Sequence, residues 1–463
     1  TNFTEISSAI DDLENSSSAT GDYDNDGKQD IAVCGYNGTD EVTKIYHNNG
    51  GSFTDISAGL QGVQNGDIKW LDYNSDGFPD LLVTGESGGT RYSLIYRNNG
   101  DGSFTDISAG LYGLTNSSVD CGDYDSDGDI DVVICGNDGT DNHTEIYRND
   151  AGVFTNILAG LTGVEEGSCQ WGDYDNDGDL DLVISGNSGN ELITKIYTNE
   201  GSDTFTEADI DLKGVRKSVT KWADYDKDND LDLLISGLDG TDEYTALLRN
   251  DIKTSNTIPD PPDDLTVAIG INSATVSWNS GSDDETNDNG LSYNIRLGRV
   301  ESGFNQIAPG ANLTNGFRKV VRIGNTGANK EMQIFRLPGG HYYWSVQTID
   351  NSFAGSEFST AGSFTVTDYH SLGIGTGWSL ISTYVEPFDT DIETICEEIV
   401  DNMLMVKNLD GDLYFPDLNI NDIDDWNIEE GYKIYMDNQD ELTFEGVKVR
   451  PENVTLSLAE DWN

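Results

Sequence analysis

The sequence contains few of the residues on which several classes of protein depend. It has 25 Lys and Arg against 84 Asp and Glu, which gives a formal net charge of -59. Phosphate binding needs a basic surface, so this balance excludes nucleic acid as a partner. Five cysteines in 463 residues are too few and too scattered for a disulfide framework. The four histidines show no spacing suited to zinc or to a catalytic dyad: His47, His143, His341 and His370.

Long apolar runs and sorting signals are also missing. No stretch of 18 apolar residues occurs, so we expect no membrane span in this sequence. There is no initiator Met and no signal-peptide pattern at Thr1, and the strand-like pattern near Asn463 breaks off. We therefore expect both ends to be cut from a longer protein. There is no Gly-x-Ser-x-Gly elbow and no phosphate-cradling loop.

What the sequence has in abundance is aspartate at fixed spacing. The clearest stretch is Gly122-Asp-Tyr-Asp-Ser-Asp-Gly-Asp-Ile-Asp-Val-Val-Ile-Cys-Gly136. Carboxylates at positions 1, 3, 5 and 9 of a loop can converge only if the chain wraps around one point, and a hard cation such as calcium would relieve their repulsion. Gly128, at position 6, supplies the backbone freedom for the turn. Position 12 is Ile134 in a β-rich run, so the pattern predicts a calcium loop between two strands and not an EF-hand.

This stretch occurs five times, in steps of 50, 51, 50 and 51 residues, which indicates a repeat architecture such as a propeller. In the fifth copy Asn229 replaces the glycine, and Asn is the residue that best tolerates the same backbone region. The predicted side-chain ligands are Asp22, Asp24, Asp26 and Asp30; Asp72, Asn74, Asp76 and Asp80; Asp123, Asp125, Asp127 and Asp131; Asp173, Asp175, Asp177 and Asp181; and Asp224, Asp226, Asp228 and Asp232.

Each repeat is expected to form four short strands, the pattern of a β-propeller blade. In the third copy the last three are 131–135, 144–149 and 153–157, and the fifth copy has no fourth strand. The chain opens with a similar lone strand, Asn2-Phe-Thr-Glu-Ile6, which would complete the last blade. Five blades can close in this way, and missing upstream blades are equally compatible with the sequence.

The motif Asp-x-Asp-x-Asp-Gly-x-x-Asp between two strands of a blade resembles the FG-GAP/VCBS repeat family, which includes the integrin α-subunit propeller. The resemblance covers residues 1–252. It implies one calcium ion per blade, up to five, bound by side chains at positions 1, 3, 5 and 9 and by the carbonyl at position 7. Propellers of this family usually have six to eight blades, so five repeats depart from the pattern. The residues at position 7 are Lys28, Phe78, Asp129, Asp179 and Asp230.

The rest of the chain predicts two further β-rich regions. A proline-containing linker at 253–262 precedes residues 263–367, which resemble a fibronectin type III β-sandwich with Trp278 in the core and Tyr342 at the tyrosine corner. Residues 298–330 are longer and richer in Gly and Asn than that fold requires. Residues 368–463 predict a small β-rich domain with one helix at 390–403, truncated at the C-terminus. The three regions together resemble the C-terminal part of secreted or surface proteins of Bacteroidetes-type bacteria. The fold class is mainly all-β.

Two patterns allow more than one interpretation. Cys121 and Cys135 flank the third loop, and we expect them to face each other across the hairpin, either as a packing pair or as a disulfide. The three segments at 38–40, 139–141 and 240–242 all read Gly-Thr-Asp at the other end of the blades. They are either a ligand-binding face or turn chemistry repeated by duplication.

We expect a secreted or cell-surface calcium-binding protein. Calcium would be structural, and the propeller would serve as a rigid adhesion or recognition platform for a protein or glycan ligand on the cell surface or matrix. We expect no enzymatic activity, because the dense aspartate pairs fall at metal-loop spacing and not as an isolated acid and base. Two alternatives stay open: the accessory region of a polysaccharide-degrading enzyme whose catalytic domain lies outside this sequence, and a propeller lectin.

Overall fold

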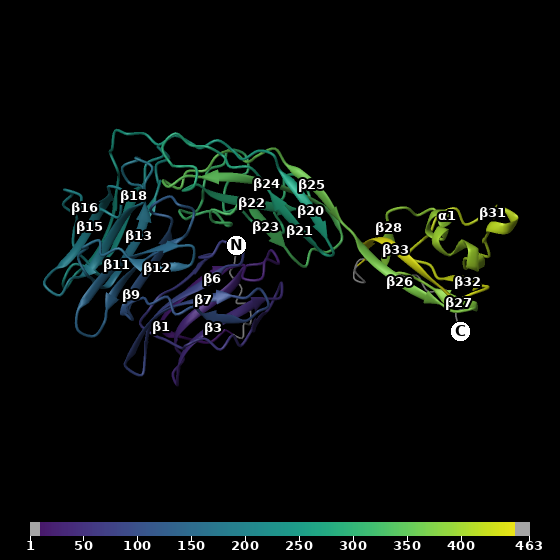
Figure 1. Cartoon of the computed structure of the whole chain (residues 1–463), viewed down its shortest axis with the longest axis horizontal. Coiled ribbons are helices and arrows are strands. Elements are labelled where there is room, and N and C mark those ends of the chain that lie inside the picture. Colours follow the sequence, from purple (N-terminus) through teal and green to yellow (C-terminus); the bar gives the residue numbers. More distant parts are fainter. Residues whose placement is uncertain (1–9, 450–463) are drawn as a thin grey trace. The chain divides into compact units, whose positions relative to one another are not determined.

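The computed structural model describes residues 10–449, and nearly all of its regular structure is β (Figure 1). Within these residues the helical segments are short: α1 (Ile392–Ile395) and the 3₁₀ turns Glu397–Asn402 and Pro416–Leu418. The predicted strand at 2–6 lies outside the described residues. The mainly all-β fold class is confirmed.

Each predicted repeat forms one antiparallel sheet whose strands follow chain order. The first sheet contains β1 (Glu14–Gly21), β2 (Asp30–Tyr36), β3 (Glu41–Asn48) and β4 (Phe53–Asp55). The second contains β5 (Ile68–Leu71), β6 (Asp80–Ser87), β7 (Thr90–Asn98) and β8 (Phe104–Asp106). The third contains β9 (Thr115–Gly122), β10 (Asp131–Asn137), β11 (Asn142–Asp150) and β12 (Val153–Asn156).

The fourth and fifth sheets continue the series. The fourth contains β13 (Glu165–Gly172), β14 (Asp181–Asn187), β15 (Leu192–Asn199) and β16 (Phe205–Glu207). The fifth has three strands, β17 (Arg216–Ala223), β18 (Asp232–Leu238) and β19 (Glu243–Leu248), as its sequence predicted. The repeats are therefore five consecutive sheets of the propeller-blade type.

The second strand of each middle repeat is buried on both faces, because a neighbouring repeat covers each side. In the third sheet Val132, Val133 and Ile134 are all fully buried. Val133 packs in a cluster with residues of the fourth repeat, and Val132 and Ile134 pack in a cluster with residues of the second. Near-continuous β-branched runs suit such two-sided burial better than an alternating pattern would.

The fifth sheet is covered differently. Leu234 and Leu247 are 37% and 48% exposed, whereas Val183 and Ile196, at the equivalent places in the fourth sheet, are 0% and 5% exposed. Leu234 lies opposite Leu247 in the register of β18 and β19, so the two residues share one face of the sheet. The last repeat therefore presents an apolar face to solvent, because no sixth repeat follows it among the described residues.

The expected opposition of Cys121 and Cys135 is wrong. In the register of β9 and β10, Cys121 lies opposite Val132 and Cys135 opposite Ser118, and both thiols are free. Gly122 pairs with Asp131, which centres the turn between Ser126 and Asp127 and not on Gly128, so the partner of Cys121 shifts by three residues. Trp171 and Trp222 lie in the first strand of their sheets and are buried, whereas Trp70 at the equivalent place is partly buried.

Two three-stranded sheets follow the repeats. One contains β20 (Thr266–Gly270), β21 (Ser273–Ser277) and β23 (Glu331–Ile334); the other contains β22 (Ser292–Gly298), β24 (Gly340–Ile349) and β25 (Gly362–Val366). Trp278 is buried, with its ring centroid 5.9 Å from that of Tyr293 and 6.3 Å from that of Trp344. Tyr342 is buried and its hydroxyl donates to the Pro338 carbonyl at 2.6 Å, the type of bond expected at a tyrosine corner. The fibronectin type III assignment stays a prediction.

The C-terminal region forms two more sheets. One contains β26 (Asp368–Ile374), β33 (Asp440–Lys448) and β28 (Val385–Pro387). The other contains β27 (Gly377–Ile381), β32 (Tyr432–Met436), β29 (Met403–Lys407), β30 (Leu413–Phe415) and β31 (Ile420–Asn421). The predicted helix at 390–403 is only in part helical. It is a four-residue α1 followed by a 3₁₀ turn, with buried Ile392 and Ile399 facing the core.

Contacts divide the chain into two compact units. One comprises Thr1–Thr266, Val276–Gln333 and Tyr343–Gly362, and the other comprises Val267–Thr275, Ile334–Tyr342 and Ser363–Asn463. The first unit thus contains the repeats together with strand β22 and most of strand β24. The predicted boundaries at 252, 262 and 367 stay predictions. No described helix is long and apolar enough to cross a membrane.

Candidate metal sites

Each predicted metal loop joins the first and second strands of its sheet, and two residues of left-handed backbone curl it. The glycine at position 6 has a φ between 82° and 99° in the first four loops, and Asn229 takes a φ of 71° in the fifth. Position 4 is also left-handed in every loop, with φ between 53° and 67°, although sequence analysis did not single it out. Asn or Ser stands there in the first four copies, and Asn suits this backbone region. The position-4 residues are Asn25, Ser75, Ser126, Asn176 and Lys227.

The aspartate at position 1 organises the turn from inside. In the fourth loop Asp173 accepts the backbone N–H groups of Asp177 and Gly178, at 3.2 and 3.1 Å, and it is 1% exposed. The same two bonds recur at Asp22, Asp72 and Asp123. In the fifth loop Asp224 keeps the bond from position 5, Asp228, and also accepts the N–H of Lys227 at position 4.

The aspartate at position 9 is fully buried in every repeat. In the fourth, Asp181 accepts the backbone N–H of Tyr174 at 3.0 Å and that of Asn199 at 2.9 Å. Equivalent pairs of bonds hold the other four: Asp30, Asp80, Asp131 and Asp232. These carboxylates therefore fix the end of the loop against the strand that follows it, whether or not they also bind a cation.

An asparagine that sequence analysis missed links each loop to its neighbours. The Asn199 side chain donates to the carbonyl of Leu180 at 3.3 Å and to that of Tyr124, in the third loop, at 2.9 Å. Asn98, Asn149 and Asn250 make the same pair of bonds, and Asn48 makes the first of them. The signal was present, because these asparagines follow the closing pattern of each repeat at the same steps of 50 and 51 residues.

The loops bring three of their predicted ligands together in four of the five repeats. Within each group the acidic oxygens lie within 4.8 Å of one another. The groups are Asp22, Asp24 and Asp26; Asp123, Asp125 and Asp127; Asp173, Asp175 and Asp181; and Asp224, Asp226 and Asp232. In the second loop, the amide of Asn74 donates to Asp76 Oδ2 at 3.0 Å, and Arg97 lies 3.4 Å from the same oxygen.

The first loop has a further candidate ligand that the sequence did not indicate. His47 Nδ1 lies 3.3 Å from Asp24 Oδ2 and 3.4 Å from Asp30 Oδ1. The residues at the same place in the other repeats are Arg97, Arg148, Thr198 and Arg249. At position 7, the Lys28 ammonium pairs with Asp26, and the Asp230 carboxylate accepts the Asn176 amide. The role of the position 7 carbonyls stays a prediction.

The fourth loop is electrostatically strained as long as its carboxylates are charged. Burial, together with repulsion from the neighbouring aspartates, raises the pKa of Asp173 to about 7 and that of Asp181 to about 9. Burial and Asp177 raise the pKa of Asp175 to about 6. Moreover, Asp175 Oδ1 is buried and has no hydrogen-bond partner. An orphaned acceptor among crowded carboxyls fits an oxygen-seeking divalent cation.

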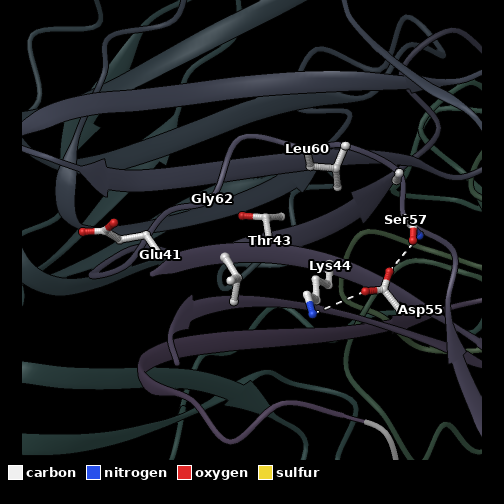
Figure 2. Close-up of a pocket in the computed structure, with 10 residues that line it drawn as sticks. Glu41, Thr43, Lys44, Asp55, Ser57, Leu60 and Gly62 are labelled. Carbon is white, nitrogen blue, oxygen red and sulfur yellow. Dashed lines mark hydrogen bonds and ion pairs between the residues drawn. The ribbon is translucent and has the colours of Figure 1, made fainter. Parts of the chain in front are cut away.

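A separate cavity of about 300 Å³ lies in the first repeat between β3 and the connector that follows β4 (Figure 2). Its lining includes Glu41, Thr43 and Leu60. The ammonium of Lys44 points toward Asp55 at 3.3 Å and also pairs with Asp11 at 2.9 Å, so its charge is already compensated. The cavity contains none of the predicted metal ligands.

The Gly-Thr-Asp segments at the other end of the sheets have local partners. Asn37 Oδ1 accepts the N–H groups of Thr39 and Asp40, both at 2.9 Å. In the third repeat Asp138 Oδ1 accepts those of Thr140 and Asp141, at 2.7 and 2.9 Å. Turn chemistry of this kind is sufficient to explain why the segments recur.

Comparisons with known proteins bear on the repeats. The model of the FG-GAP-like repeat matches residues 22–83, 72–134, 123–184 and 173–235. Among curated proteins none matches the chain. Fructan 1-exohydrolase IIa from Cichorium intybus is 10% identical, with a TM-score of 0.29 over 91% of this chain and 93% of its own. The FN1–FN3 domains of chicken CNTN1 are 12% identical, with a TM-score of 0.19 over 61% and 98%.

These TM-scores are too low for the likeness to either structure to carry an argument. The family match, in contrast, begins each of its four segments at the first aspartate of a metal loop. It agrees in period with the five consecutive sheets of the structure. Residues 22–235 therefore consist of FG-GAP-like repeats, and their sheets are of the β-propeller blade type.

Proposed function

We propose that the chain is a calcium-binding scaffold of an extracellular or cell-surface protein. The observation that carries the proposal is the fourth loop, where Asp173, Asp175 and Asp181 converge and one buried carboxylate oxygen lacks a partner. FG-GAP repeats are typical of extracellular proteins, and millimolar calcium outside cells would suffice for sites of modest affinity. The large excess of acidic residues also suits a solvated extracellular surface.

The aspartates at positions 1, 3, 5 and 9 would hold the ion in each repeat, with Asn74 in place of one carboxylate in the second. A bound divalent cation supplies positive charge that offsets the repulsion among these carboxylates. The residues of the chain already set the path of the loop through backbone hydrogen bonds to positions 1 and 9. Calcium would therefore stabilise a preformed loop, and its role would be structural.

The rigid array would present a surface for a protein or glycan ligand, without catalysis. Support comes from the consecutive packing of the sheets, which fixes loops at both ends of the blades. The predicted ligands lie at metal-loop spacing and accept hydrogen bonds from the backbone of their own loops. These are properties of a structural site and not of an exposed acid and base pair.

Calcium titration of the full chain by calorimetry, paired with thermal melts in calcium and in chelator, tests the proposal. We expect up to five sites and a rise in melting temperature on adding calcium. Magnesium is the control, because it demands a smaller, more regular shell and should bind more weakly. Absence of binding heat together with identical melts would refute calcium binding.

A further inference from the structure

The metal loops of the repeats are in contact with a second part of the same compact unit, which comprises residues 285–333 and 343–353. The contact reaches all five loops. A Cβ atom added to Gly27 would lie 3.0 Å from the Gln306 carbonyl oxygen, and one added to Gly290 would lie 2.5 Å from Ser126 Oγ. The Lys227 ammonium lies 4.6 Å from the centre of the Phe317 ring. These contacts belong to the first, third and fifth loops.

The second loop is reached through a hydrogen bond. The Asn329 side chain donates to Asp72 Oδ2 at 2.7 Å. Nearby apolar residues extend the same contact into the repeats. Ile323 packs against the cluster between the second and third repeats and against the cluster formed by the third, fourth and fifth. The stretch 298–330, which is longer than a fibronectin type III fold requires, thus supplies residues that pack onto the repeats.

The fourth loop makes several direct hydrogen bonds with this part of the chain. The turn 350–353 brings Ser352 Oγ to 3.1 Å from Asp173 Oδ2 and to 2.9 Å from Asn176 Oδ1. The Asn351 side chain donates to the carbonyl of Gly178 at 2.9 Å, and the Asp173 N–H donates to the Asn351 carbonyl at 3.3 Å. Asn351 and Ser352 are each 5% exposed. Two residues of this turn therefore touch positions 1, 4 and 6 of the loop.

More acceptor oxygens surround the Ser352 hydroxyl than its single proton can bond to. It has one proton, and three oxygens lie within 3.4 Å: Asp173 Oδ2, the Asp173 carbonyl and Asn176 Oδ1. Together with the orphaned Asp175 Oδ1, this end of the unit holds an excess of buried acceptor oxygens. A cation relieves such an excess, and the residues that orient its ligands commonly affect its affinity.

The turn itself is held rigidly. The fully buried Asp350 accepts the Asn256 amide at 2.8 Å and the Ala354 N–H at 2.7 Å. Phe353 takes a left-handed φ of 58°, which is costly for a bulky residue, and its side chain is buried in the cluster of the fourth and fifth repeats. Packing against the repeats is what holds this strained residue in place.

We propose that the fourth metal site is composite: the repeat supplies the carboxylates, and the turn 350–353 supplies Ser352 as a positioning residue. Cation binding at this loop and seating of the turn on the repeats then stabilise each other. Without a cation, the converging carboxyls of Asp173, Asp175 and Asp181 have no common partner, and the loop that Ser352 and Asn351 contact is held less firmly. With a cation the loop is fixed. Because such coupling is reciprocal, a substitution that weakens the packing of the turn on the repeats also lowers the affinity of the loop for the cation. This inference rests on the proposed calcium binding.

Hydrogen exchange of the full chain, with and without calcium, tests the coupling directly. We expect calcium to slow exchange at residues 350–354 as well as at the fourth loop. The same experiment on the wild-type chain separates the two proposals. If calcium binds and protects the loops but leaves 350–354 unchanged, the composite site is wrong and the calcium-binding proposal stands. If no loop gains protection and no heat of binding is seen, the calcium-binding proposal itself is wrong.

The variant Ser352→Ala sharpens the test. We expect it to weaken one calcium site about tenfold, the low end for residues that orient metal ligands, and to reduce the calcium-dependent protection of 350–354. Ser302→Ala, an exposed serine in the same region, is the matched control and should leave both readouts unchanged. Wild-type calcium affinity at every site of a folded Ser352→Ala chain would overturn the proposal.

Discussion

The second and fourth metal loops share one spacing but differ in the charges around it. The fourth has three converging carboxylates, and the neighbouring strand residue Thr198 is neutral. In the second, Asn74 replaces a carboxylate and Arg97 lies 3.4 Å from Asp76. Both loops nevertheless have the same backbone hydrogen bonds to positions 1 and 9. The motif therefore sets the path of the chain, and under the proposed calcium binding we expect the surrounding charges to set how strongly each loop holds the ion.

The largest expected effect is the pH dependence of the metal-free chain. Burial raises the pKa of Asp181 to about 9 and that of Asp80 to about 8, against 3.8 for an ordinary Asp. The folded chain therefore holds protons that the unfolded chain releases. The stabilisation is complete below about pH 4 and is lost as pH rises toward 8 or 9, by at most about 1.4 kcal/mol per unit for each group. Urea melts in chelator at pH 5, 6, 7 and 8 measure this.

Calcium should reverse that slope, because it competes with protons for the same oxygens. The variants Asp80→Asn and Asp181→Asn each remove one of the titrating groups and should flatten the slope in chelator. An unchanged or rising free energy of unfolding between pH 5 and 8 in chelator would contradict the account.

Removing a position 9 carboxylate should lower the free energy of unfolding by nearly as much, and the second and fourth loops should respond differently in calcium. Asp181→Ala and Asp80→Ala each leave two buried backbone N–H groups without an acceptor, so both should lose about 2 kcal/mol or more in chelator. In calcium, the loss in free energy of unfolding should be greater for Asp181→Ala than for Asp80→Ala, because we expect the fourth loop to be the stronger calcium site. Urea melts in both conditions measure it, and equal losses in calcium would show that the two loops bind alike.

The asparagine that links neighbouring loops should contribute about 1–2 kcal/mol. Asn199→Ala removes two buried side-chain donors, to the Leu180 and Tyr124 carbonyls. Asn98→Ala does the same two repeats earlier, between the first and second loops. Since these bonds involve backbone and not the carboxylates, both losses should persist in chelator. Urea melts showing a loss only in calcium would place these asparagines in the metal sites instead.

The smallest effect is expected from exchanging the residues that distinguish the two loops. Arg97→Thr should strengthen the second site and Thr198→Arg should weaken the fourth, each by a few-fold. The Arg97 side chain is half exposed, so solvent screening limits its influence. Calorimetric titration measures both variants. Opposite or absent changes would mean that the neighbouring charge does not rank the sites.

The repeated features were predictable because they recur. The spacing of the aspartates predicted the loops and the five sheets, and the missing fourth strand of the last repeat was visible in the sequence. Asn199 and its equivalents recur with the same period, and only their pairing with the preceding loop needed the structure. The register at Cys135 was missed because the turn is centred between Ser126 and Asp127 and not on the glycine at position 6.

The contact between Ser352 and Asp173 had no such signal. The two residues are 179 positions apart, and the turn 350–353 has no counterpart elsewhere in the chain from which a period could be read. Asn329 and Asp72 are 257 positions apart and equally without a pattern. Contacts of this kind depend on how segments far apart in the sequence pack together, which local propensity and spacing do not encode.

Crystals of the full chain grown with calcium, and the anomalous differences measured from them, would test the central claim most directly. The account predicts peaks within the aspartate loops, strongest in the fourth repeat between Asp173, Asp175 and Asp181, and weakest in the second. Loops without peaks in a crystal saturated with calcium, or peaks confined to other surfaces, would contradict it.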